Sequence, residues 1–343
     1  MMEKGKANIT ITDVAKKAGV SKTTISRYLN GKFEFMSAES QQRIKNIIEE
    51  LNFRPNNLAR SLKSSKSRLI GVLIADISNP FSSILVKGIT DYCKQCGYNV
   101  VIANTDNDSV KEREYILSMI DQRVEGLIVN ATGNNNEFLR NIADNYIPIV
   151  LADRPISPTM FDTVRTNDYQ ATVDALTYLA KEGFTRVGFF TEPIGNIGTR
   201  TSRQQAYREV CHELLHMEPQ EYVIDSKDEC GIENLVQKFL SDNSGEDCVI
   251  FTANGVTMLG VLRAIHKFGL RIPQDIAICG FDDWPWMELI GPGITVISQP
   301  FYDIGVESVK RMLFRIEKNA KDNPEVIELP NQFIIRGSTK LKK

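Results

Sequence analysis

Polar and charged side chains of the kind that bind small molecules recur directly after apolar runs of this chain. They stand at residues 76–79, at Asp153 and Arg154, at Asn254, and at Asp282 and Asp283. In sheets of parallel strands, ligands bind beyond the carboxyl ends of the strands. Carboxylates and guanidiniums placed there can bracket ligand hydroxyl groups with charge-assisted hydrogen bonds. The sequence therefore predicts a ligand-binding cleft at these strand ends.

Residues 212–216 spell H-E-x-x-H, a second arrangement with chemical potential. On an α-helix this spacing places two imidazoles on one face with a possible general base between them, as in zinc proteases. Only one other histidine, His266, is present, and nothing marks a third ligand. The segment continues a helix begun at Ser202, with inward-facing positions at Val210, Leu214 and Met217. We therefore expect no metal site and no catalytic residues.

The cysteines suggest neither a redox centre nor a disulfide framework. Cys93 and Cys96 have the C-x-x-C spacing of a redox or zinc pair, but they fall within a predicted helix and no second such pair exists. The six cysteines are scattered over 343 residues, so reduced thiols are expected. No apolar run reaches the roughly 18 residues of a membrane span, and the N-terminus lacks a secretory signal. The cytoplasm is the expected compartment.

The positive charge of the chain is concentrated at its N-terminus. The first 68 residues hold 14 of the 41 Lys and Arg residues and 6 of the 43 Asp and Glu residues. That segment carries a net charge of +8 and the rest carries −10, which the overall charge of −2 hides. A small basic module joined to a large acidic body favours a protein that reads nucleic acid and carries a second function.

Two short helices joined by a tight turn are predicted within residues 10–29. Gly19 can adopt a positive φ and end the first helix, and Ser21 is a good N-cap for the second. Asn30 and Gly31 stop that second helix. Its apolar positions and those of its partner are Val14, Ala18, Ile25 and Leu29. This is the layout of a helix-turn-helix, whose second helix lies in the major groove of DNA.

The exposed positions of the second helix are Lys22, Thr23, Ser26 and Arg27. A third helix follows and covers the other two. Its apolar stripe has the spacing i, i+3, i+4 and i+7 and consists of Ile44, Ile47, Ile48 and Leu51.

Residues 54–67 then read RPNNLARSLKSSKS, which is too short for a stable isolated helix and would fold only on a partner. A plain flexible tether is the alternative for this stretch, and a basic bundle that docks on protein is the alternative for the whole module.

From residue 68 onward, apolar runs alternate with amphipathic helices. Buried parallel strands are expected at 69–76, 99–104, 126–131, 148–153, 186–191, 248–254 and 276–283. Helices fit between them, for example at 84–96 and 111–121. Strand–helix alternation of this kind predicts a doubly wound α/β fold.

These residues resemble the LacI/GalR family of bacterial transcriptional regulators. The pattern D-V-A-x-x-A-G-V-S-x-x-T-[IV]-S-R-x-L-N matches from Asp13 to Asn30, and R-P-N-x-x-A-R-x-L matches from Arg54 to Leu62. The resemblance continues through the body. It implies a small all-α helix-turn-helix headpiece at 1–54, a hinge helix and linker at 55–67, and an effector-binding and dimerisation body at 68–343. That body resembles a periplasmic sugar-binding protein with two doubly wound parallel-sheet subdomains.

Within the body, the resemblance implies a first subdomain at about 68–164 and 295–328 and a second at about 165–294 and 329–343. The chain is then expected to cross between them near Arg165, Ile294 and Leu329. A cleft between two such lobes can close around a ligand by hinge motion.

The resemblance also assigns residues that contact DNA. Base readout falls on Lys22, Thr23 and Arg27, with Ser26 on the same face. In the hinge, Leu62 would insert into the minor groove and bend the DNA, and Ala59 would lie at the close dimer contact. Asn56 and Lys63 complete the predicted DNA-binding set. The aromatic segment 32–36, KFEFM, departs from the family and is expected to leave the readout helix alone.

Carried over position by position, the family's effector cleft is lined by eight residues of this chain. They are Ser78, Phe81, Asp153, Arg203, Asn254, Asp282, Gln299 and Phe301. Arg203 and Asp282 match the family's ligand-clamping pair. Phe81 would form an aromatic wall against a sugar ring. The family usually has an aspartate after the position of Asn254, where this chain has Gly255.

The resemblance implies a homodimeric transcriptional regulator, expected to be a repressor of carbohydrate-utilisation genes. Its partners would be a pseudo-palindromic double-stranded DNA operator and a sugar or sugar-acid effector, with no cofactor and no membrane. The aromatic insertion and the stretch 152–155 are similar to regulators of ketodeoxygluconate genes in Gram-positive bacteria. One alternative is a catabolite-control regulator whose corepressor is a phosphocarrier protein. A remote alternative is a zinc hydrolase acting through His212, Glu213 and His216.

Overall fold

The computed structural model describes residues 9–53, 66–318 and 323–340. The chain divides into two compact units, residues 1–67 and 68–343, and each has hydrophobic clusters of its own. The predicted hinge and linker segment spans residues 55–67, and the structure does not describe residues 54–65. Its predicted DNA-binding residues Asn56, Ala59, Leu62 and Lys63 therefore lie outside the described residues.

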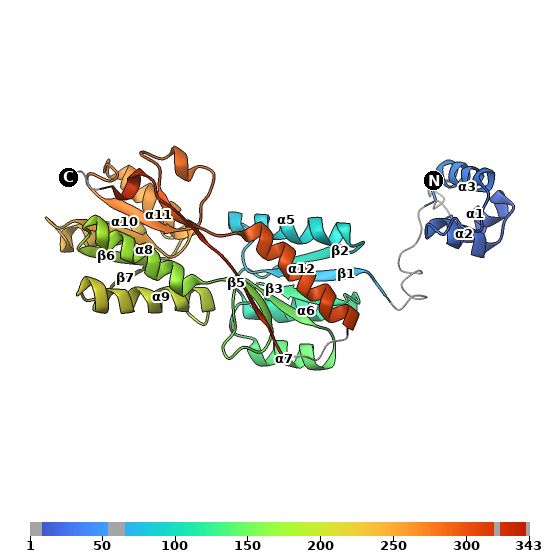
Figure 1. Ribbon diagram of the computed structural model, residues 1–343, viewed down its shortest axis with the longest axis horizontal. Coiled ribbons are helices and arrows are strands. Elements are labelled where there is room, and N and C mark those ends of the chain that lie inside the picture. Colours follow the sequence, from blue (N-terminus) through green and yellow to red (C-terminus); the bar gives the residue numbers. More distant parts are fainter. Residues whose placement is uncertain (1–8, 54–65, 319–322, 341–343) are drawn as a thin grey trace, which may run out of the picture. The chain divides into compact units, whose positions relative to one another are not determined.

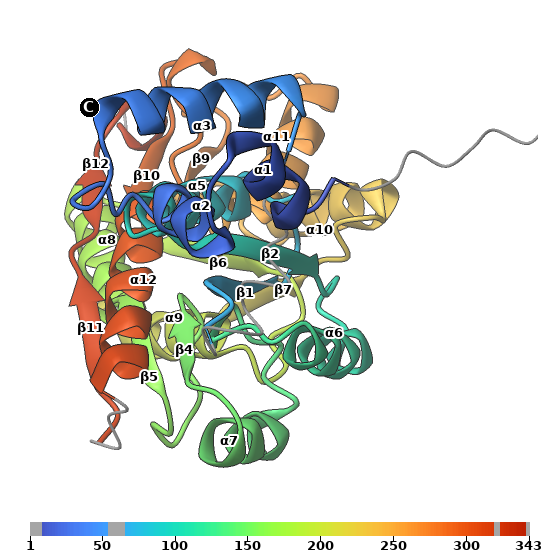
Figure 2. The same cartoon turned by 90° about the vertical axis from the view of Figure 1, so that its right-hand side faces the viewer.

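The first unit contains the three helices predicted from the sequence: α1 (Ile11–Ala18), α2 (Lys22–Leu29) and α3 (Ala38–Glu50). Gly19 ends α1 at a φ of 65°, and the Ser21 side chain accepts the Thr24 N–H at 3.1 Å to cap α2. The three helices bury a small core at Val14, Ala18, Ile25 and Ile44, and α3 lies across the other two (Figure 2). This unit is a helix-turn-helix with a covering third helix.

The second unit contains two lobes, each a six-stranded sheet with helices on both faces (Figure 1). The sheet of the first lobe has the order β11-β5-β4-β3-β1-β2 and all its pairs are parallel. Its strands are β1 (Leu69–Ile74), β2 (Asn99–Asn104), β3 (Gly126–Val129), β4 (Ile149–Ala152), β5 (Asp162–Thr166) and β11 (Val326–Leu329). Helices α5 (Pro80–Gln95) and α12 (Phe301–Lys318) cover one face, and α6 (Ser109–Asp121) and α7 (Asn136–Asn145) cover the other.

The sheet of the second lobe repeats this scheme in the order β12-β10-β9-β8-β6-β7. Its strands are β6 (Arg186–Thr191), β7 (Gln220–Val223), β8 (Cys248–Thr252), β9 (Ala277–Phe281), β10 (Thr295–Ser298) and β12 (Gln332–Ile334), of which β12 is antiparallel to β10. Helices α8 (Asp168–Glu182) and α9 (Gly198–Val210) cover one face, and α10 (Glu229–Asp242) and α11 (Gly255–Lys267) cover the other. The α/β fold with two doubly wound sheets is therefore as predicted.

Three of the described segments cross between the lobes. The first is Asn167, between β5 and α8, the second is residues 299–300, between β10 and α12, and the third is residues 330–331, between β11 and β12. The sequence placed the second crossing near Ile294, which is wrong because β10 pairs with β9 in the second lobe. The Gly-Pro-Gly at 291–293 lies in the turn that enters this buried strand.

All seven strands expected from the sequence are present, although one has a different environment. The run at 99–104 was expected to be buried, but β2 lies at the edge of its sheet and each of its residues is half-buried or exposed. Five further strands were missed. They are β5, β7, β10, β11 and β12, which are short and carry polar residues that weaken the apolar signal.

The helix that carries the H-E-x-x-H pattern changes register near its end. Val210 and Met217 are buried as predicted, but Leu214 is exposed. Residues Cys211–Leu215 form one π-helical turn, which rotates the following side chains relative to a continuous α-helix. Leu215 consequently takes the inward position and packs against the core of the second lobe.

Cys93 lies within α5 as predicted, whereas Cys96 is the C-cap residue that follows it. Both are free thiols, and burial raises the pKa of Cys93 to about 12, which makes it a weak nucleophile. None of the described helices is both long enough and apolar enough to cross a membrane.

Candidate functional site

A cleft lies in the second unit where the carboxyl ends of the strands of both sheets meet. Its lining comes from loops after β1, β2, β4, β6, β8 and β9, from the start of α9 and from the second crossing. The lining residues are Asp76, Asn79, Phe81, Asn107, Asp153, Arg154, Glu192, Thr199, Arg200, Arg203, Asn254, Val256, Asp282, Gln299 and Phe301. The position is the one that parallel-sheet topology predicts for a ligand.

The structure brings together seven of the eight residues predicted for the effector cleft. Ser78 is the exception, since it is exposed and does not line the cleft. Its hydroxyl donates to Asp76 Oδ1 at 2.6 Å, within the turn that precedes α5. The residues that reach the cleft from this turn are Asp76 and Asn79.

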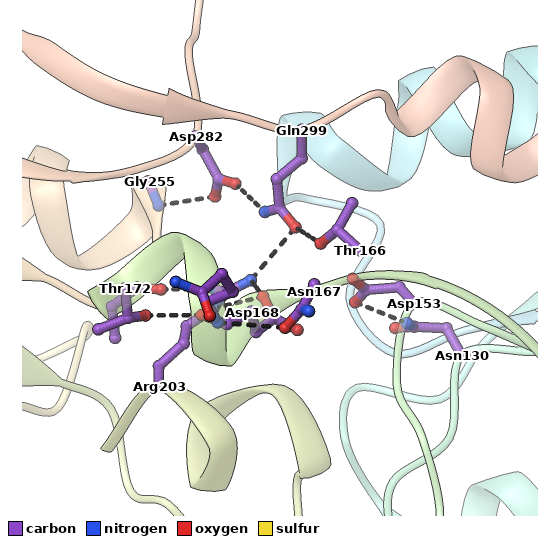
Figure 3. A network of polar contacts seen from close by, with 12 residues as sticks. Asn130, Asp153, Thr166, Asn167, Asp168, Thr172, Arg203, Gly255, Asp282 and Gln299 are labelled. Carbon is purple, nitrogen blue, oxygen red and sulfur yellow. Dashed lines mark hydrogen bonds and ion pairs between the residues drawn. The ribbon is translucent and has the colours of Figure 1, made fainter. Parts of the chain in front are cut away.

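The Arg203 side chain is buried, at 4% exposure, and several neighbours in the cleft fix its position. Figure 3 shows these contacts. The Arg203 Nε and Nη2 atoms donate to Asp168 Oδ1 at 2.8 and 2.5 Å, and Nη1 donates to the Ala253 carbonyl at 2.5 Å. The guanidinium carbon also lies 3.6 Å from the centre of the Phe281 ring. Asp168 itself was not predicted. It begins α8 directly after the first crossing, so only the folded chain places it beside Arg203.

Asp282 connects the second lobe to the second crossing. Its Oδ2 accepts the Gly255 N–H at 2.8 Å and its Oδ1 accepts the Gln299 Nε2–H at 2.8 Å. Gln299 Oε1 in turn accepts the Thr166 hydroxyl at 3.0 Å and an Arg203 N–H at 3.3 Å (Figure 3). Burial raises the pKa of Asp282, and the positive charge of Arg203 opposes that effect. The polar network of the cleft is therefore continuous with two of the three crossings.

Asp153 is the buried carboxyl on the first-lobe side of the cleft. It adopts a φ of 70°, and Asn130 Nδ2 donates to its Oδ2 at 3.4 Å. Burial, together with the negative charge of Asp168, raises the pKa of Asp153 to about 7. Near neutral pH this group can therefore present either a proton donor or a pure acceptor to a ligand.

Asp153→Asn is expected to make the protein more stable than the unmodified protein at both pH values, with a larger difference at pH 8 than at pH 5.5. The raised pKa means that the folded form holds a proton which the unfolded form loses above about pH 4, so wild-type stability falls as the pH rises towards 7. The expected gain between pH 5.5 and 8 is about 2 kcal/mol. Asparagine also tolerates the positive φ. Thermal unfolding at the two pH values measures it, and an equal difference at both would contradict the raised pKa.

Two further arginines line the cleft and differ in their partners. Arg200 forms an ion pair with Glu192 and donates to the Pro193 carbonyl. Arg154 donates from Nη1 to Asn107 Oδ1 at 2.8 Å and to the Ala131 carbonyl at 3.2 Å. Within 66–318 and 323–340, Arg154 forms no ion pair. Glu192 and Asn107 were missed, although both follow strands and the rule applied to the other polar clusters would have found them.

Phe81 and Phe301 provide an apolar wall. Their ring centres lie 4.2 Å apart at an interplanar angle of 65°, and both rings are buried. Phe81 is in the first turn of α5 and Phe301 begins α12 after the second crossing. The cleft thus combines carboxylates, guanidiniums, amides and an aromatic face, which is the set that binds a polyhydroxylated ligand.

Trp284 explains why glycine follows Asn254. Asn254 caps α11 through the Thr257 N–H at 2.9 Å, and its Nδ2 donates to Glu192 at 2.9 Å. A Cβ atom at Gly255 would lie 2.6 Å from the indole ring of Trp284. Trp284 is buried and packs edge-on against Trp286, so the ring has little freedom to move.

Gly255→Ala is therefore expected to destabilise the protein by about 1–3 kcal/mol, the usual cost of overpacking. Helix propensity alone would predict the opposite sign, since alanine is the better helix former. Chemical denaturation measures the effect. The same substitution in a Trp284→Leu background should cost much less, and an equal cost in both backgrounds would exclude the indole contact as the cause.

The predicted DNA-reading side chains lie together on α2. Lys22, Thr23, Ser26 and Arg27 are all exposed, as predicted. The expectation that the aromatic segment leaves this helix alone is wrong. The Arg27 guanidinium carbon lies 5.5 Å from the centre of the Phe35 ring, and Tyr28 packs edge-on against Phe33 at 5.6 Å.

The H-E-x-x-H segment does not have the geometry of a zinc site. His212 lies in the π-helical turn, and His216 follows it at a φ of 50°, so the motif does not occupy a continuous α-helix. Both imidazoles are exposed. Among the residues that the structure describes, no group of three His, Cys, Asp or Glu side chains could hold a metal ion.

The two units each match a described family. Residues 10–56 match the bacterial regulatory proteins of the lacI family, and residues 67–337 match the periplasmic binding proteins and sugar binding domain of the LacI family. The chain is 42% identical to the HTH-type transcriptional regulator KdgR of Bacillus subtilis, over 98% of this chain and 100% of KdgR. It is 35% identical to the HTH-type transcriptional regulator PtxS of Pseudomonas putida, over 96% of both chains.

The fold also matches a solved structure, that of the lac repressor dimer bound to operator and the anti-inducer ONPF. The TM-score is 0.84 at 24% identity, over 97% of this chain and 99% of that chain. A helix-turn-helix unit followed by a two-lobed body with a polar cleft defines the class of ligand-controlled DNA-binding regulators. The chain belongs to the LacI family of bacterial transcriptional regulators. Its function is DNA-binding regulation of transcription and not enzymatic catalysis.

Proposed function

We propose that this regulator acts in the cytoplasm as a homodimeric repressor of carbohydrate-utilisation genes, released from or recruited to its operator by a sugar acid bound in the cleft. Lys22, Thr23 and Arg27 would read bases in the major groove of each half-site, and the hinge residues Ala59 and Leu62 would pair over the operator centre. The 42% identity between this chain and KdgR supports the assignment to regulators of carbohydrate-utilisation genes.

The proposal that the effector is an acid rests on Arg154, whose positive charge has no ion-pair partner among the described residues. Arg203 is neutralised by Asp168 and Arg200 by Glu192, whereas the Arg154 guanidinium forms no ion pair within the described residues. Its two hydrogen bonds both use Nη1, which leaves other N–H groups for a ligand. A carboxylate suits a guanidinium fork in geometry and in charge. Asp153, Asn254 and Asp282 would then bind hydroxyl groups of the same ligand.

A thermal-shift experiment with four probes tests the proposal. Ketodeoxygluconate and glucuronate should stabilise the protein, whereas glucose and glucose 6-phosphate should stabilise it less. Bound ligand stabilises by RT ln(1 + [L]/Kd), so a concentration series gives the affinities. Arg154→Gln should remove the preference for the acids. Equal stabilisation by glucose, or an unchanged preference in the variant, would contradict the sugar-acid assignment.

The homodimer is supported by apolar side chains exposed on the first lobe. Ile84 of α5, Ile102 of the edge strand β2 and Tyr115 of α6 are all exposed, on elements that are neighbours in the fold. Exposed apolar groups that gather on one region mark interaction surfaces. The lac repressor structure of the same fold is a dimer. Sedimentation of the protein as a monomer at micromolar concentration would contradict this part of the proposal.

A further inference from the structure

The segment between α2 and α3 is held in a defined conformation against the readout helix. The Lys32 N–H donates to the Arg27 carbonyl at 3.0 Å, which folds the chain back onto the end of α2. The Met36 N–H donates to the Phe33 carbonyl at 2.9 Å, and the Met36 carbonyl accepts from the Gln41 side chain at 3.1 Å. These bonds close a turn at both ends, so the backbone that carries its aromatic residues is held against the end of α2.

The two phenylalanines of this turn have different environments. Phe33 packs edge-on against Tyr28 and is the more covered of the two. Phe35 is 78% exposed, and the side chain it contacts is Arg27, whose guanidinium carbon lies over the ring at 5.5 Å. An aromatic ring this exposed is not explained by the headpiece core, which is formed by other residues.

Arg27 has few other constraints. It is an exposed side chain on α2, and within residues 9–53 it forms no ion pair. An unconstrained arginine side chain samples many rotamers. Restricting it to one rotamer when it binds DNA costs free energy, which reduces the net gain from contacting the correct base. A cation–π contact at this distance restricts the guanidinium without consuming its N–H donors. Those donors remain available for the acceptor atoms of a guanine edge.

We infer that Phe35 is a specificity-determining residue of the DNA interface: its ring positions the Arg27 guanidinium for base readout. The inference rests on the proposed role of Arg27 in reading operator bases. Phe35 is thus a positioning residue that acts through Arg27. The turn after α2 thereby affects base readout through Arg27.

Selection of operators from a randomised oligonucleotide pool tests this with the full-length protein. The base pair read by Arg27 is first identified as the position whose preference disappears in Arg27→Ala. In Phe35→Ala and Phe35→Leu, preference at that base pair should fall about five-fold, the loss expected for an exposed cation–π contact of about 1 kcal/mol. Phe35→Tyr should retain the preference at that base pair, because the tyrosine ring keeps the π face. Preferences at the other base pairs should be unchanged.

Phe33→Ala is the matched control, since it removes a ring from the same turn that does not contact Arg27. It should lower the melting temperature without changing preference at the Arg27 position. The inference is overturned if Phe35→Leu keeps full preference, if Phe35→Tyr does not retain it, or if all base pairs lose preference equally. An unmodified protein that selects no sequence would instead overturn the proposed function, so the two failures are distinguishable.

Discussion

Asp282→Asn is expected to abolish the effector response while leaving operator affinity unchanged. The carboxylate accepts two hydrogen bonds, from the Gly255 N–H and from Gln299 Nε2. Asparagine has one oxygen and one NH₂ group, so one of these donors would face another donor. The substitution also removes the negative charge from the lobe opposite Asp153. In the proposed complex the Asp282 carboxylate also binds an effector hydroxyl group. Losing a hydrogen bond to a buried charged group costs about 3 kcal/mol, so effector affinity should fall about 100-fold.

The measurement is a gel shift of operator DNA with and without the sugar acid identified by thermal shift. Asp283→Asn is the matched control, because the neighbouring aspartate does not line the cleft and forms an ion pair with Arg336. The control should respond to effector as the unmodified protein does. If Asp282→Asn still responds at the original effector concentration, the cleft is not the effector site.

Arg27→Ala is the second substitution with a large expected effect, this time on DNA alone. Arginine forms bidentate hydrogen bonds with the guanine edge, and such a contact discriminates against a wrong base by about 1–3 kcal/mol. With one Arg27 in each half-site of a dimer, operator affinity should fall by a factor of about 100 or more, while binding to random DNA falls only slightly. Folding should be unaffected, because the side chain is exposed.

Arg43→Ala is the control for charge, since Arg43 is an exposed arginine of the same headpiece on α3. It should reduce specific and non-specific binding by similar small factors. Titration of both variants against operator and random DNA at two salt concentrations separates base reading from phosphate attraction. If both variants lost operator affinity by the same factor, Arg27 would not be a residue that reads bases.

The headpiece was predictable because its signals are local. A glycine at the end of one helix, a serine cap at the start of the next and an apolar stripe on the third lie within a few residues of one another. Interactions that return from further along the chain were not predictable. The contact between Phe35 and Arg27 depends on how a turn folds back, and the spacing of residues does not show this.

The cleft was predictable as a location and only partly as a network. Polar residues after strands gather wherever parallel strands end together, so Asp153, Asn254 and Asp282 were found from strand positions. Asp168, the partner of Arg203, comes from a crossing segment whose course is set by tertiary packing. The short strands β5 and β10 were missed for a different reason, because four or five residues with polar members carry little periodic signal.

The last two strands have a consequence for biosynthesis. β11 completes the first sheet by pairing with β5, and a few residues later β12 completes the second by pairing with β10. A nascent chain therefore carries two unprotected sheet edges until β11 and β12 have been synthesised and have paired, and exposed edges favour aggregation. A premature stop that removes residues from 326 onward would leave both lobes incomplete at once, and such truncated chains are expected to depend on chaperones or to be degraded.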